Sequence, residues 1–342
     1  MNRIWLLALG LAILSYSLAH VYRIAATALQ ILDHPNHRSA HSQVTPTGAG
    51  ITFVAVFFLS VWLMTRAQCP HPEAEMIFRL LPALLVVTVL GLIDDFRALP
   101  WPFRFAVHTL CAAWVVYIIG FPLLQFPMTS WDTGIAGLAF GVIALVWLLN
   151  LYNFMDGIDG IAISEAVFAF CGASLVAWLS DVGLSQSVIV LIGTCMGFLV
   201  IIWPKARVFM GDGGSGFLGL ILGALALAEV LVPVWSWMIL LGWFIADACL
   251  TITLRALRGE TIHEAHSQHA YQHLNRAIGT TRTLLIVHLV NLFWLLPLAW
   301  FAATAQEWGL FLLILALLPV LIGQFYCGAG QATPRMKAIK PD

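Results

Sequence analysis

Residues 189–202 read IVLIGTCMGFLVII and contain no charged side chain. Apolar and polar residues do not alternate along this run, as they would along a strand of a membrane barrel. Because a lipid bilayer admits only helices and closed barrels, the run predicts a helix of a membrane protein. It belongs to one of the charge-free stretches that we expect to span the bilayer. These stretches are residues 4–22, 42–65, 80–93, 105–131, 133–155, 166–180, 182–204, 213–228, 230–246, 283–306 and 308–334.

The composition predicts the same class of protein. Hydrophobic residues make up 61% of the 342 residues and charged residues 10%, whereas about 25% are charged in a soluble domain. These values exclude soluble globular, disordered and collagen-like chains. The formal net charge is −1 and no basic stripe is visible, so we expect no nucleic-acid partner. We predict a single all-α domain, a polytopic integral membrane bundle of about 11 transmembrane helices in the lipid bilayer.

The distribution of Lys and Arg predicts the orientation of the bundle. With the N-terminus outside, the outer side holds Arg3, Arg66 and Arg79, and the remaining 13 of the 16 Lys and Arg lie on the cytoplasmic side. The C-terminus is then cytoplasmic. The cytoplasmic loops are residues 33–47, 94–104, 150–160, 203–216 and 255–282. A cleaved signal peptide is the alternative for the N-terminus, because Arg3 and an apolar stretch precede Ser17-Leu18-Ala19.

Aspartates lie at or just beyond several of the cytoplasmic helix ends. The third stretch is followed by Asp94 and Asp95, the fifth by Asp156 and Asp159, and the seventh by Asp212. A helical bundle gathers these ends into one region. Carboxylates in such a region either bind a hard cation through oxygen or transfer protons. For any single one of them, a solvated loop acid is the simpler interpretation.

Residues 150–160 read NLYNFMDGIDG and repeat a polar residue every three positions. On a helix this spacing places Asn150, Asn153, Asp156 and Asp159 on neighbouring positions of one face. Polar groups at this depth in a membrane are costly and usually functional. We therefore expect the stripe to take part in substrate binding and catalysis, with helix capping by an aspartate as the alternative.

Residues 209–216 read FMGDGGSG and open the eighth stretch. Gly-rich turns before a helix can bind phosphate through backbone N–H groups. The carboxylate of Asp212 fits better with Mg²⁺ held between a carboxylate and a diphosphate, because Mg²⁺ prefers one or two carboxylates plus substrate phosphates. Lys205 and Arg207 precede the turn and suit phosphate oxygens.

The longest polar loop carries His263, His266, His269 and His273. The last three have the spacing of one helical face. A zinc site is one interpretation, although no Cys or firmly placed acid accompanies them. Binding or protonation of phosphates is a second interpretation, and a solvated loop face is the third.

The first cytoplasmic loop is polar, basic and rich in turn residues. Its Arg38 and His41 can meet an anionic lipid headgroup. The excess of positive charge on cytoplasmic loops also explains Arg38 without any ligand.

Together these segments resemble one family, the polyprenyl-phosphate N-acetylhexosamine-1-phosphate transferases. The resemblance covers about residues 30–290 in family order and looks closest to the branch that initiates O-antigen. The matching segments are Pro35-Asn36-His-Arg38-Ser-x-His41, Thr45-Pro46-Thr47-Gly48-x-Gly50, Gly91-x-x-Asp94-Asp95, Asn150–Gly160, Phe209-Met-Gly-Asp212, Asp247 with Arg255 and Gly259, and the histidine loop. In that branch an Arg commonly follows the first His of the loop, whereas Ser267 stands here.

The resemblance implies transfer of N-acetylhexosamine-1-phosphate from a UDP-HexNAc donor to undecaprenyl phosphate, with release of UMP, at the cytoplasmic face of a bacterial inner membrane. It implies Mg²⁺, or alternatively Mn²⁺, on Asp212 and Asp156, uracil against Phe209, and the lipid phosphate at Asp94. The catalytic residues expected are Asp94, Asp95, Asp156, Asp159, His266 and His269, and the substrate-binding residues are Asn150, Asn153, Phe209, Arg38, His41, Lys205 and His273. The resemblance also allows a homodimer. It leaves open the sugar, the polysaccharide and a one-step or two-step mechanism.

Two alternatives stay open at this point. A UDP-MurNAc-pentapeptide transferase of peptidoglycan synthesis belongs to the same family, but we expect its histidine loop to differ. A cation-coupled transporter belongs to another class and would require acids at mid-membrane and a pseudo-repeat. No repeat is visible in the sequence, and Asp247 is the best feature of this second alternative.

Overall fold

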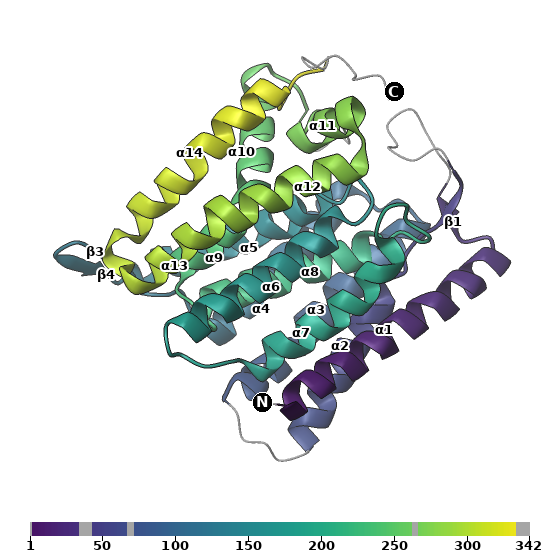
Figure 1. Cartoon of the computed structure of the whole chain (residues 1–342), viewed down its shortest axis with the longest axis horizontal. Helices are drawn as coiled ribbons and strands as arrows, with labels where there is room; N and C mark the ends of the chain where they lie inside the picture. The colour runs from purple at the N-terminus through teal and green to yellow at the C-terminus, as the bar shows by residue number, and fades with distance from the viewer. Residues whose placement is uncertain (1, 34–42, 67–71, 262–265, 333–342) are drawn as a thin grey trace.

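The computed structural model describes residues 2–33, 43–66, 72–261 and 266–332, and in them the chain forms long helices that lie side by side (Figure 1). The first five helices are α1 (Asn2–Ala28), α2 (Gly50–Arg66), α3 (Pro72–Phe96), α4 (Trp101–Ile119) and α5 (Gly134–Phe154). Next come α6 (Ile161–Leu179), α7 (Gln186–Ile202), α8 (Asp212–Leu227), α9 (Val234–Leu240) and α10 (Gly242–Leu257). The last are α11 (Ala270–Ile278), α12 (Thr280–Val290), the π segment η1 (Asn291–Leu295), α13 (Leu296–Thr304), the 3₁₀ turn η2 (Gln306–Trp308) and α14 (Gly309–Cys327).

Extended structure is confined to two short antiparallel pairs in the described chain. β1 (Leu32–Asp33) pairs with β2 (Thr45–Pro46), and β3 (Leu124–Phe126) pairs with β4 (Thr129–Trp131). The apolar run at residues 189–202 is helical, within α7. The Ser185 hydroxyl oxygen caps this helix by accepting a hydrogen bond from the Val188 N–H at 3.2 Å. The predicted class, an all-α polytopic membrane bundle, is confirmed.

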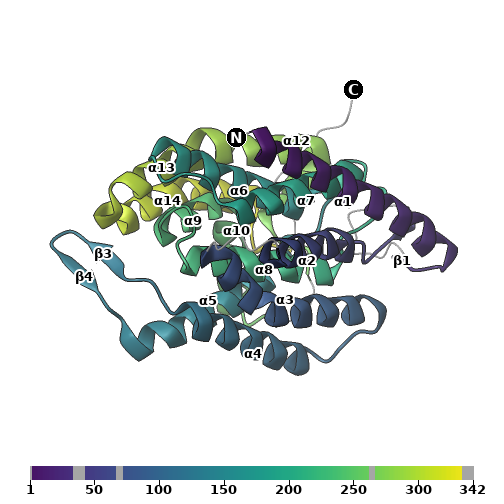
Figure 2. The same ribbon diagram turned by 90° about the horizontal axis from the view of Figure 1, so that it is seen from below.

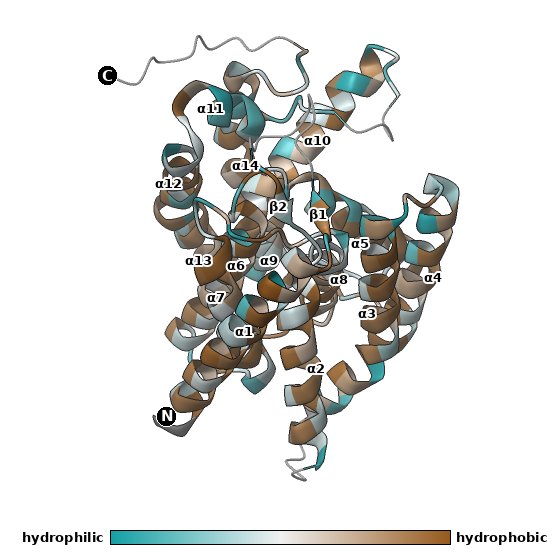
Figure 3. Cartoon of the chain, turned by 90° about the vertical axis from the view of Figure 1, so that its right-hand side faces the viewer, coloured by the Kyte–Doolittle hydropathy of each residue, from teal (hydrophilic) through white to brown (hydrophobic). Residues whose placement is uncertain are grey.

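The helices have the length and hydropathy of membrane spans. Seven of those in the described residues are long and apolar enough to cross a bilayer, or eight if α9 and α10, which meet at 74°, form one broken span. The shorter helices α2, α7 and α8 are apolar as well. In Figure 3 the long helices are mainly hydrophobic, whereas α11 and the far turn of α10 carry hydrophilic residues. The number of crossings and their orientation stay predictions.

The stretch at residues 105–131 differs from the single span that we expected. Helix α4 ends at Ile119, because Gly120 adopts a positive φ of 85° and Pro122 follows. The rest of the stretch forms the β3–β4 hairpin. A lack of charge identified the stretch, but it could not distinguish an apolar hairpin from the end of a helix.

Helix α8 lies at the centre of the bundle. In Figure 2 it is placed between a layer formed by α3, α4 and α5 and a layer that contains α1, α6 and α7. Every residue of α8 after Asp212 is buried. Gly219 allows α8 to approach α5 closely, since a Cβ there would lie 2.7 Å from the Leu149 Cα. The first residue of this buried helix, Asp212, is therefore held on a fixed support.

Candidate active site

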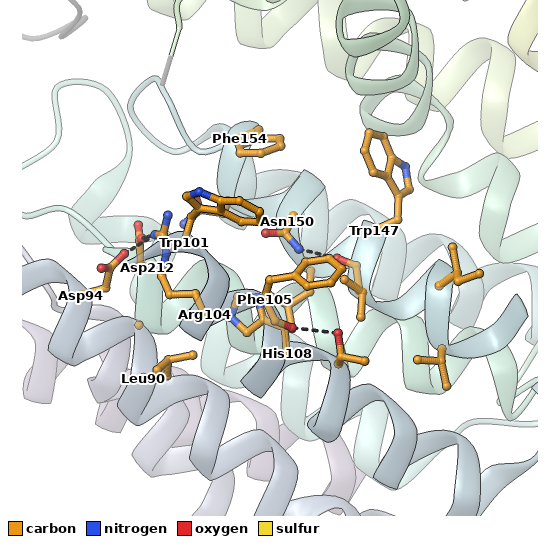
Figure 4. A pocket seen from close by; sticks show the side chains of 18 of the residues that line it. Leu90, Asp94, Trp101, Arg104, Phe105, His108, Trp147, Asn150, Phe154 and Asp212 are labelled. Atoms are coloured by element: carbon orange, nitrogen blue, oxygen red, sulfur yellow. Dashed lines mark hydrogen bonds and ion pairs between the residues drawn. The ribbon is translucent and has the colours of Figure 1, made fainter. Parts of the chain in front are cut away.

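The ends of α3, α4 and α8 bring two carboxylates and one guanidinium together. The Arg104 side chain forms an ion pair with Asp94 and lies 3.6 Å from Asp212, measured from Nη1 to Oδ2 (Figure 4). The Leu99 N–H also donates to Asp94 Oδ1 at 2.6 Å, which fixes that carboxylate. The predicted grouping of Asp94 with Asp212 is thus present in the structure, with Arg104 between them.

Asp95 is turned toward the backbone of the Gly-rich turn. Its Oδ1 accepts a hydrogen bond from the Asp212 N–H at 2.9 Å. A Cβ on Gly211 would lie 2.2 Å from Asp95 Oδ2, so only a glycine admits this contact. Asp95 therefore caps the first turn of α8 and holds Asp212 in place.

A second close approach fixes the same turn against α3. A Cβ added at Gly91 would lie 2.4 Å from the Asp212 carbonyl carbon. The backbones of α3 and α8 are therefore in direct contact at the site, and the position of Asp212 is set by backbone packing as well as by Asp95.

The two asparagines of α5 line the same site. The Asn153 side-chain N–H donates to the Ser215 Oγ at 3.3 Å, and the Ser215 hydroxyl donates to the Asp212 carbonyl oxygen at 3.4 Å. Asn150 donates to the Val146 carbonyl of its own helix at 2.7 Å. Asn153 thus belongs to the hydrogen-bond network around the α8 N-terminus.

The polar stripe expected from residue 150 to residue 160 does not continue as one helix. Helix α5 ends at Phe154 and α6 begins at Ile161. Gly160, with φ of 75°, breaks the helical path between them. Asp156 and Asp159 therefore lie in the connection between the two helices, beyond the end of the stripe.

Asp156 and Asp159 have different surroundings within the α5–α6 connection. The Asp159 Oδ2 accepts from the Ala206 N–H at 2.9 Å, which ties this connection to the segment before α8. Burial raises the pKa of Asp156 well above its usual value, and the charges of Asp212, Asp95 and Asp159 raise it further. Asp156 and Asp212 are therefore electrostatically close, and a cation near them would relieve their repulsion.

The segment before α8 is hydrogen-bonded to the first loop. The Phe209 N–H donates to the Pro46 carbonyl at 2.7 Å, and the Ala49 and Gly50 N–H groups donate back to the carbonyls of Phe209 and Met210 at 3.0 and 2.8 Å. Phe209 is half-buried beside Asp212 in this ladder.

The remaining predicted basic residues of these loops are less defined. The Lys205 and Arg207 side chains are exposed, and their predicted binding to phosphate stays a prediction. Arg38 and His41, which we predicted to bind substrate, lie outside the described residues, as does His263.

His269 is held by a buried aspartate of α10. The Asp247 carboxylate accepts from the His269 Nδ1 at 3.2 Å and from the N–H groups of Ala270 and Tyr271 at 2.9 and 3.0 Å. Asp247 therefore caps α11 and also orients the His269 ring. The Nε2 of that ring is buried and has no hydrogen-bond partner within the described chain. The pair has the arrangement of an oriented base or acid.

His266 lies on the ring of His269. The two ring centroids are 4.9 Å apart, and the Phe154 ring is 6.4 Å from His266. Burial lowers the pKa of His266 to about 3, and the neighbouring His269 and Arg255 add to the shift. His266 is therefore neutral near pH 7.

His273 is engaged within the chain on both sides. Its Nε2 lies 3.1 Å from the Gln331 carbonyl oxygen, and Arg276 donates to its Nδ1 at 3.0 Å. The ring is fully buried, and burial lowers its pKa. These contacts join α11 to the segment after α14, so the geometry gives His273 a positioning function; the predicted contact with substrate stays a prediction.

Tyr271 connects α11, the helix that follows His269, to the α5–α6 connection that carries Asp156 and Asp159. Its hydroxyl donates to the Phe154 carbonyl oxygen at 3.0 Å. Its oxygen would lie 2.1 Å from a Cβ at Gly157, so a glycine is required there. The two parts of the site therefore meet where α5 ends.

A cavity of about 500 Å³ opens beside Asp94 and Asp212 (Figure 4). Its walls come from α3, α4, α5, α8 and α10 and are mainly apolar. Aromatic and aliphatic walls include Trp101, Phe105, Val142, Ile143, Trp147, Phe154 and Ile252. Asp94, Arg104 and Asp212 are also part of the lining. The cavity thus combines an apolar body with a charged end.

The donor set suits a hard divalent cation. Among the described residues no group of three or more His, Cys, Asp or Glu forms a complete metal site. Mg²⁺, however, usually takes one or two carboxylates and completes its shell with phosphates and water. Asp212 and Asp156 supply carboxylate oxygens of that kind, so the residues fit the ion.

Comparison with known proteins agrees with this arrangement. The model of glycosyl transferase family 4 matches residues 77–229, the region that contains the aspartates from Asp94 to Asp212. Over these residues, which are less than half of the chain, the protein is similar to glycosyl transferase family 4. The resemblance to polyprenyl-phosphate sugar-phosphate transferases is thereby confirmed.

The proteins to which the chain is similar include three bacterial transferases. A probable undecaprenyl-phosphate N-acetylglucosaminyl 1-phosphate transferase of Bacillus subtilis is 26% identical over 285 residues, which are 78% of this chain and 76% of the relative. An undecaprenyl-phosphate alpha-N-acetylglucosaminyl 1-phosphate transferase of Thermotoga maritima is 25% identical over 276 residues, 81% of this chain and 84% of the relative. A phospho-N-acetylmuramoyl-pentapeptide-transferase of Levilactobacillus brevis is 28% identical over 207 residues, 55% of this chain and 62% of the relative.

Sequence reasoning missed three side chains of this site. Arg104 was counted only toward the orientation of the bundle. It lies ten residues after Asp94, at the start of the next helix, and this proximity could have suggested an ion pair. Asp247 was named as part of one matching segment of the resemblance and as a transporter feature, but it was given no role at the site, because nothing in the sequence shows that it contacts His269. Tyr271 lies inside the histidine loop and carried no signal of its own.

Proposed function

We propose that the protein transfers N-acetylhexosamine-1-phosphate from a UDP-HexNAc donor to undecaprenyl phosphate and releases UMP. The observation that carries this proposal is the apolar cavity that ends at Asp94, Arg104 and Asp212. A polyprenyl phosphate has the matching chemistry, a long apolar chain with one anionic end. The printed names of the relatives support the same acceptor class.

Arg104 is the residue that we assign to the acceptor phosphate. Its guanidinium is always charged and can bind phosphate oxygens in a bidentate manner. With its side chain 34% exposed, it can exchange its contact with Asp94 for a phosphate. Asp94 then positions the acceptor or takes up its last proton. Since a lipid phosphate is already largely ionised near neutral pH, base catalysis contributes little.

Asp212 and Asp156 are the residues that we assign to Mg²⁺, with Mn²⁺ as the alternative ion. The bound ion would neutralise the charge of the donor diphosphate. Asp95 keeps Asp212 in position through the α8 cap. Asn153 fixes the same turn through Ser215.

The donor is assigned to the side of the site formed by Phe209 and the histidine loop. Phe209 can stack on the uracil, and Lys205 with Arg38 and His41 can bind the donor or the headgroup. His266 and His269 supply hydrogen-bond donors where negative charge develops on departing UMP. Asp159 supports this side through the backbone of Ala206.

The proposed reaction is a phosphoryl substitution. An oxygen of the acceptor phosphate forms a bond to the phosphorus that carries the sugar. The bond from that phosphorus to the UMP phosphate oxygen breaks, and UMP leaves with the electron pair. The product is undecaprenyl-diphospho-HexNAc. We place the reaction at the cytoplasmic face of a bacterial inner membrane, as the first step of O-antigen or a related polysaccharide, in a monomer or a homodimer.

The test of this function is a donor panel. Purified protein with undecaprenyl phosphate and Mg²⁺ would be given UDP-GlcNAc, UDP-GalNAc, their deoxy analogues and UDP-MurNAc-pentapeptide, and UMP release would be measured. We expect one HexNAc donor to be used. Use of UDP-MurNAc-pentapeptide alone would favour the function printed for the Levilactobacillus brevis relative. No UMP from any donor would refute the proposed function.

The cytoplasmic placement has its own test. A cysteine introduced at Gln331, in a variant without the native cysteines, should react with a membrane-impermeant maleimide only after the cells are permeabilised. Labelling of intact cells would place the segment after α14, and the histidine helix bonded to it, on the outer face.

A further inference from the structure

A buried polar pair joins α6 to the π segment η1. The Asn291 side-chain N–H donates to Glu165 Oε2 at 2.5 Å, and both side chains are fully buried. Among the described residues Glu165 has no ion-pair partner. An ionisable residue at such a position is costly and usually functional. Neither residue belongs to the site described above.

A second hydrogen bond runs beside the first between the same two helices. His288 Nε2 lies 3.0 Å from the Ser164 Oγ. Ser164 and Glu165 are adjacent on α6, and His288 and Asn291 are one turn apart on α12 and η1. Two neighbouring interhelical contacts therefore fix the position of α12 relative to the first turn of α6.

The backbone at Asn291 is unusual. Residues Asn291–Leu295 form a π segment between α12 and α13. A π segment is usually a single inserted residue in an α-helix and is frequently found at functional sites. Here it places Asn291 against Glu165, so the helix gives up regular hydrogen bonding where the contact is made.

The two helices joined in this way carry the two parts of the site. Helix α6 begins directly after the connection with Asp156 and Asp159, and α12 begins directly after α11, whose cap is His269. At the level of the site, Tyr271 already joins these parts through the Phe154 carbonyl. The Glu165–Asn291 contact would brace the same two elements through α6 and η1.

We propose that Glu165 and Asn291, with Ser164 and His288, form an intramembrane brace. The brace sets the distance between the α5–α6 connection, which carries Asp156 and Asp159, and α11, the helix that His269 caps. Glu165 and Asn291 are thus positioning residues for the transfer, an assignment that rests on the proposed function. A misplacement of about 1 Å can cost a reaction roughly 100-fold in rate. The brace needs the hydrogen bond from Asn291, whereas it does not need a charge on Glu165.

The test is a set of matched variants. Asn291→Leu keeps the volume and removes the donor, and we expect kcat to fall roughly tenfold or more with the donor KM within about twofold. Glu165→Gln keeps the acceptor and should retain kcat within about threefold. The control is Ser15→Ala, which removes a buried interhelical hydrogen bond of 2.7 Å to the Thr194 carbonyl in α7, far along the chain from the site. It should leave kcat unchanged.

Two readouts separate positioning from general stability. If the brace and the Tyr271 hydroxyl hold the same spacing, the losses of Asn291→Leu and Tyr271→Phe are less than additive in the double variant. The combination of Ser15→Ala with Tyr271→Phe should be additive. Additive losses for both pairs, or a Glu165→Gln variant as impaired as Asn291→Leu, would overturn the proposal.

Hydrogen–deuterium exchange tests the brace without any transfer assay. In Asn291→Leu, exchange should rise in the peptides that cover residues 154–161 and 268–276, and in Ser15→Ala it should not. Unchanged exchange in both peptides would refute the brace. Inactivity of the native chain with every donor would refute only the proposed function, since the exchange result stands apart from it.

Discussion

Two aspartates of this protein hold a basic partner, and they do so in opposite ways. Asp94 pairs with Arg104 at the charged end of the cavity, where the Arg104 and Asp94 side chains are 34% and 9% exposed. Asp247 pairs with His269 where the two side chains are 0% and 2% exposed. The open pair can exchange its partner for a substrate, whereas the sealed pair keeps one geometry.

The difference in exposure predicts how substitutions in the two pairs will affect activity and stability. An ion pair whose guanidinium reaches solvent contributes less stability than a sealed one, so Arg104 can exchange its partner at small cost when a phosphate or a cation arrives. A buried carboxylate that accepts several hydrogen bonds is costly to disturb. We therefore expect substitutions in the open pair to change activity with little effect on folding, and substitutions in the sealed pair to change both.

The largest effect is expected for Asp212→Asn, beside the open pair. Loss of one carboxylate beside Arg104 and Asp156 should reduce transfer roughly 10²–10³-fold, because electrostatic stabilisation is the main requirement of the reaction. Rates of UMP release across a Mg²⁺ titration measure it. The melting temperature of the purified protein should change little. Mg²⁺-dependent turnover at the native rate would exclude Asp212 as a metal ligand.

Asp247→Asn should come next and should affect activity and stability together. The amide cannot accept all the hydrogen bonds that Asp247 now accepts, and His269 loses its charged partner. Loss of such an outer partner typically costs 10–100-fold, so we expect about that loss in kcat and a lower melting temperature. Asp94→Asn is the matched variant in the open pair. If it lowers the melting temperature as much as Asp247→Asn does, the distinction between open and sealed pairs is wrong.

The pH dependence of stability sharpens the comparison on the sealed side. The pKa of His266 is about 3 in the folded protein and about 6.5 in an unfolded chain. The folded state thus favours the neutral ring. Its contribution is present above pH 6.5 and is lost as the pH falls from there toward 3. The melting temperature should fall between pH 7 and pH 5, and less so in His266→Gln. An equal fall in both proteins would show that another group is responsible.

The smallest effect is expected for His273→Gln. Both ring nitrogens of His273 contact the chain itself, so the variant should lower the melting temperature slightly and reduce kcat less than about threefold. His269→Gln, four residues earlier and beside the site, is the comparison and should lose most activity. A kcat loss for His273→Gln as large as that for His269→Gln would place His273 at the substrate.

Much of this architecture follows from the sequence, for physical reasons that can be named. Membrane helices lack charge, and so the charge-free stretches predicted where helices lie. They did not predict where each helix ends, as residues 105–131 show. The grouping of Asp94 with Asp212 followed from helix ends on one face. Arg104 and Asp247 could not be assigned, because their partners lie on other helices and nothing local distinguishes them from solvated or structural charges. The polar stripe predicted beyond Phe154 was wrong, because α5 ends at that residue and Asp156 and Asp159 lie in the connection to α6.

The ladder between the first loop and the segment before α8 has a consequence for biogenesis. Pro46, Ala49 and Gly50 are synthesised long before their partners Phe209 and Met210. Contacts between segments so far apart in sequence close slowly, because the intervening chain must first be ordered. The amino-terminal loop therefore stays without these partners until the segment that follows α7 has been synthesised. The active site is accordingly a late part of the protein to form, and a chain truncated at the end of α7 would hold the first seven helices but no ladder.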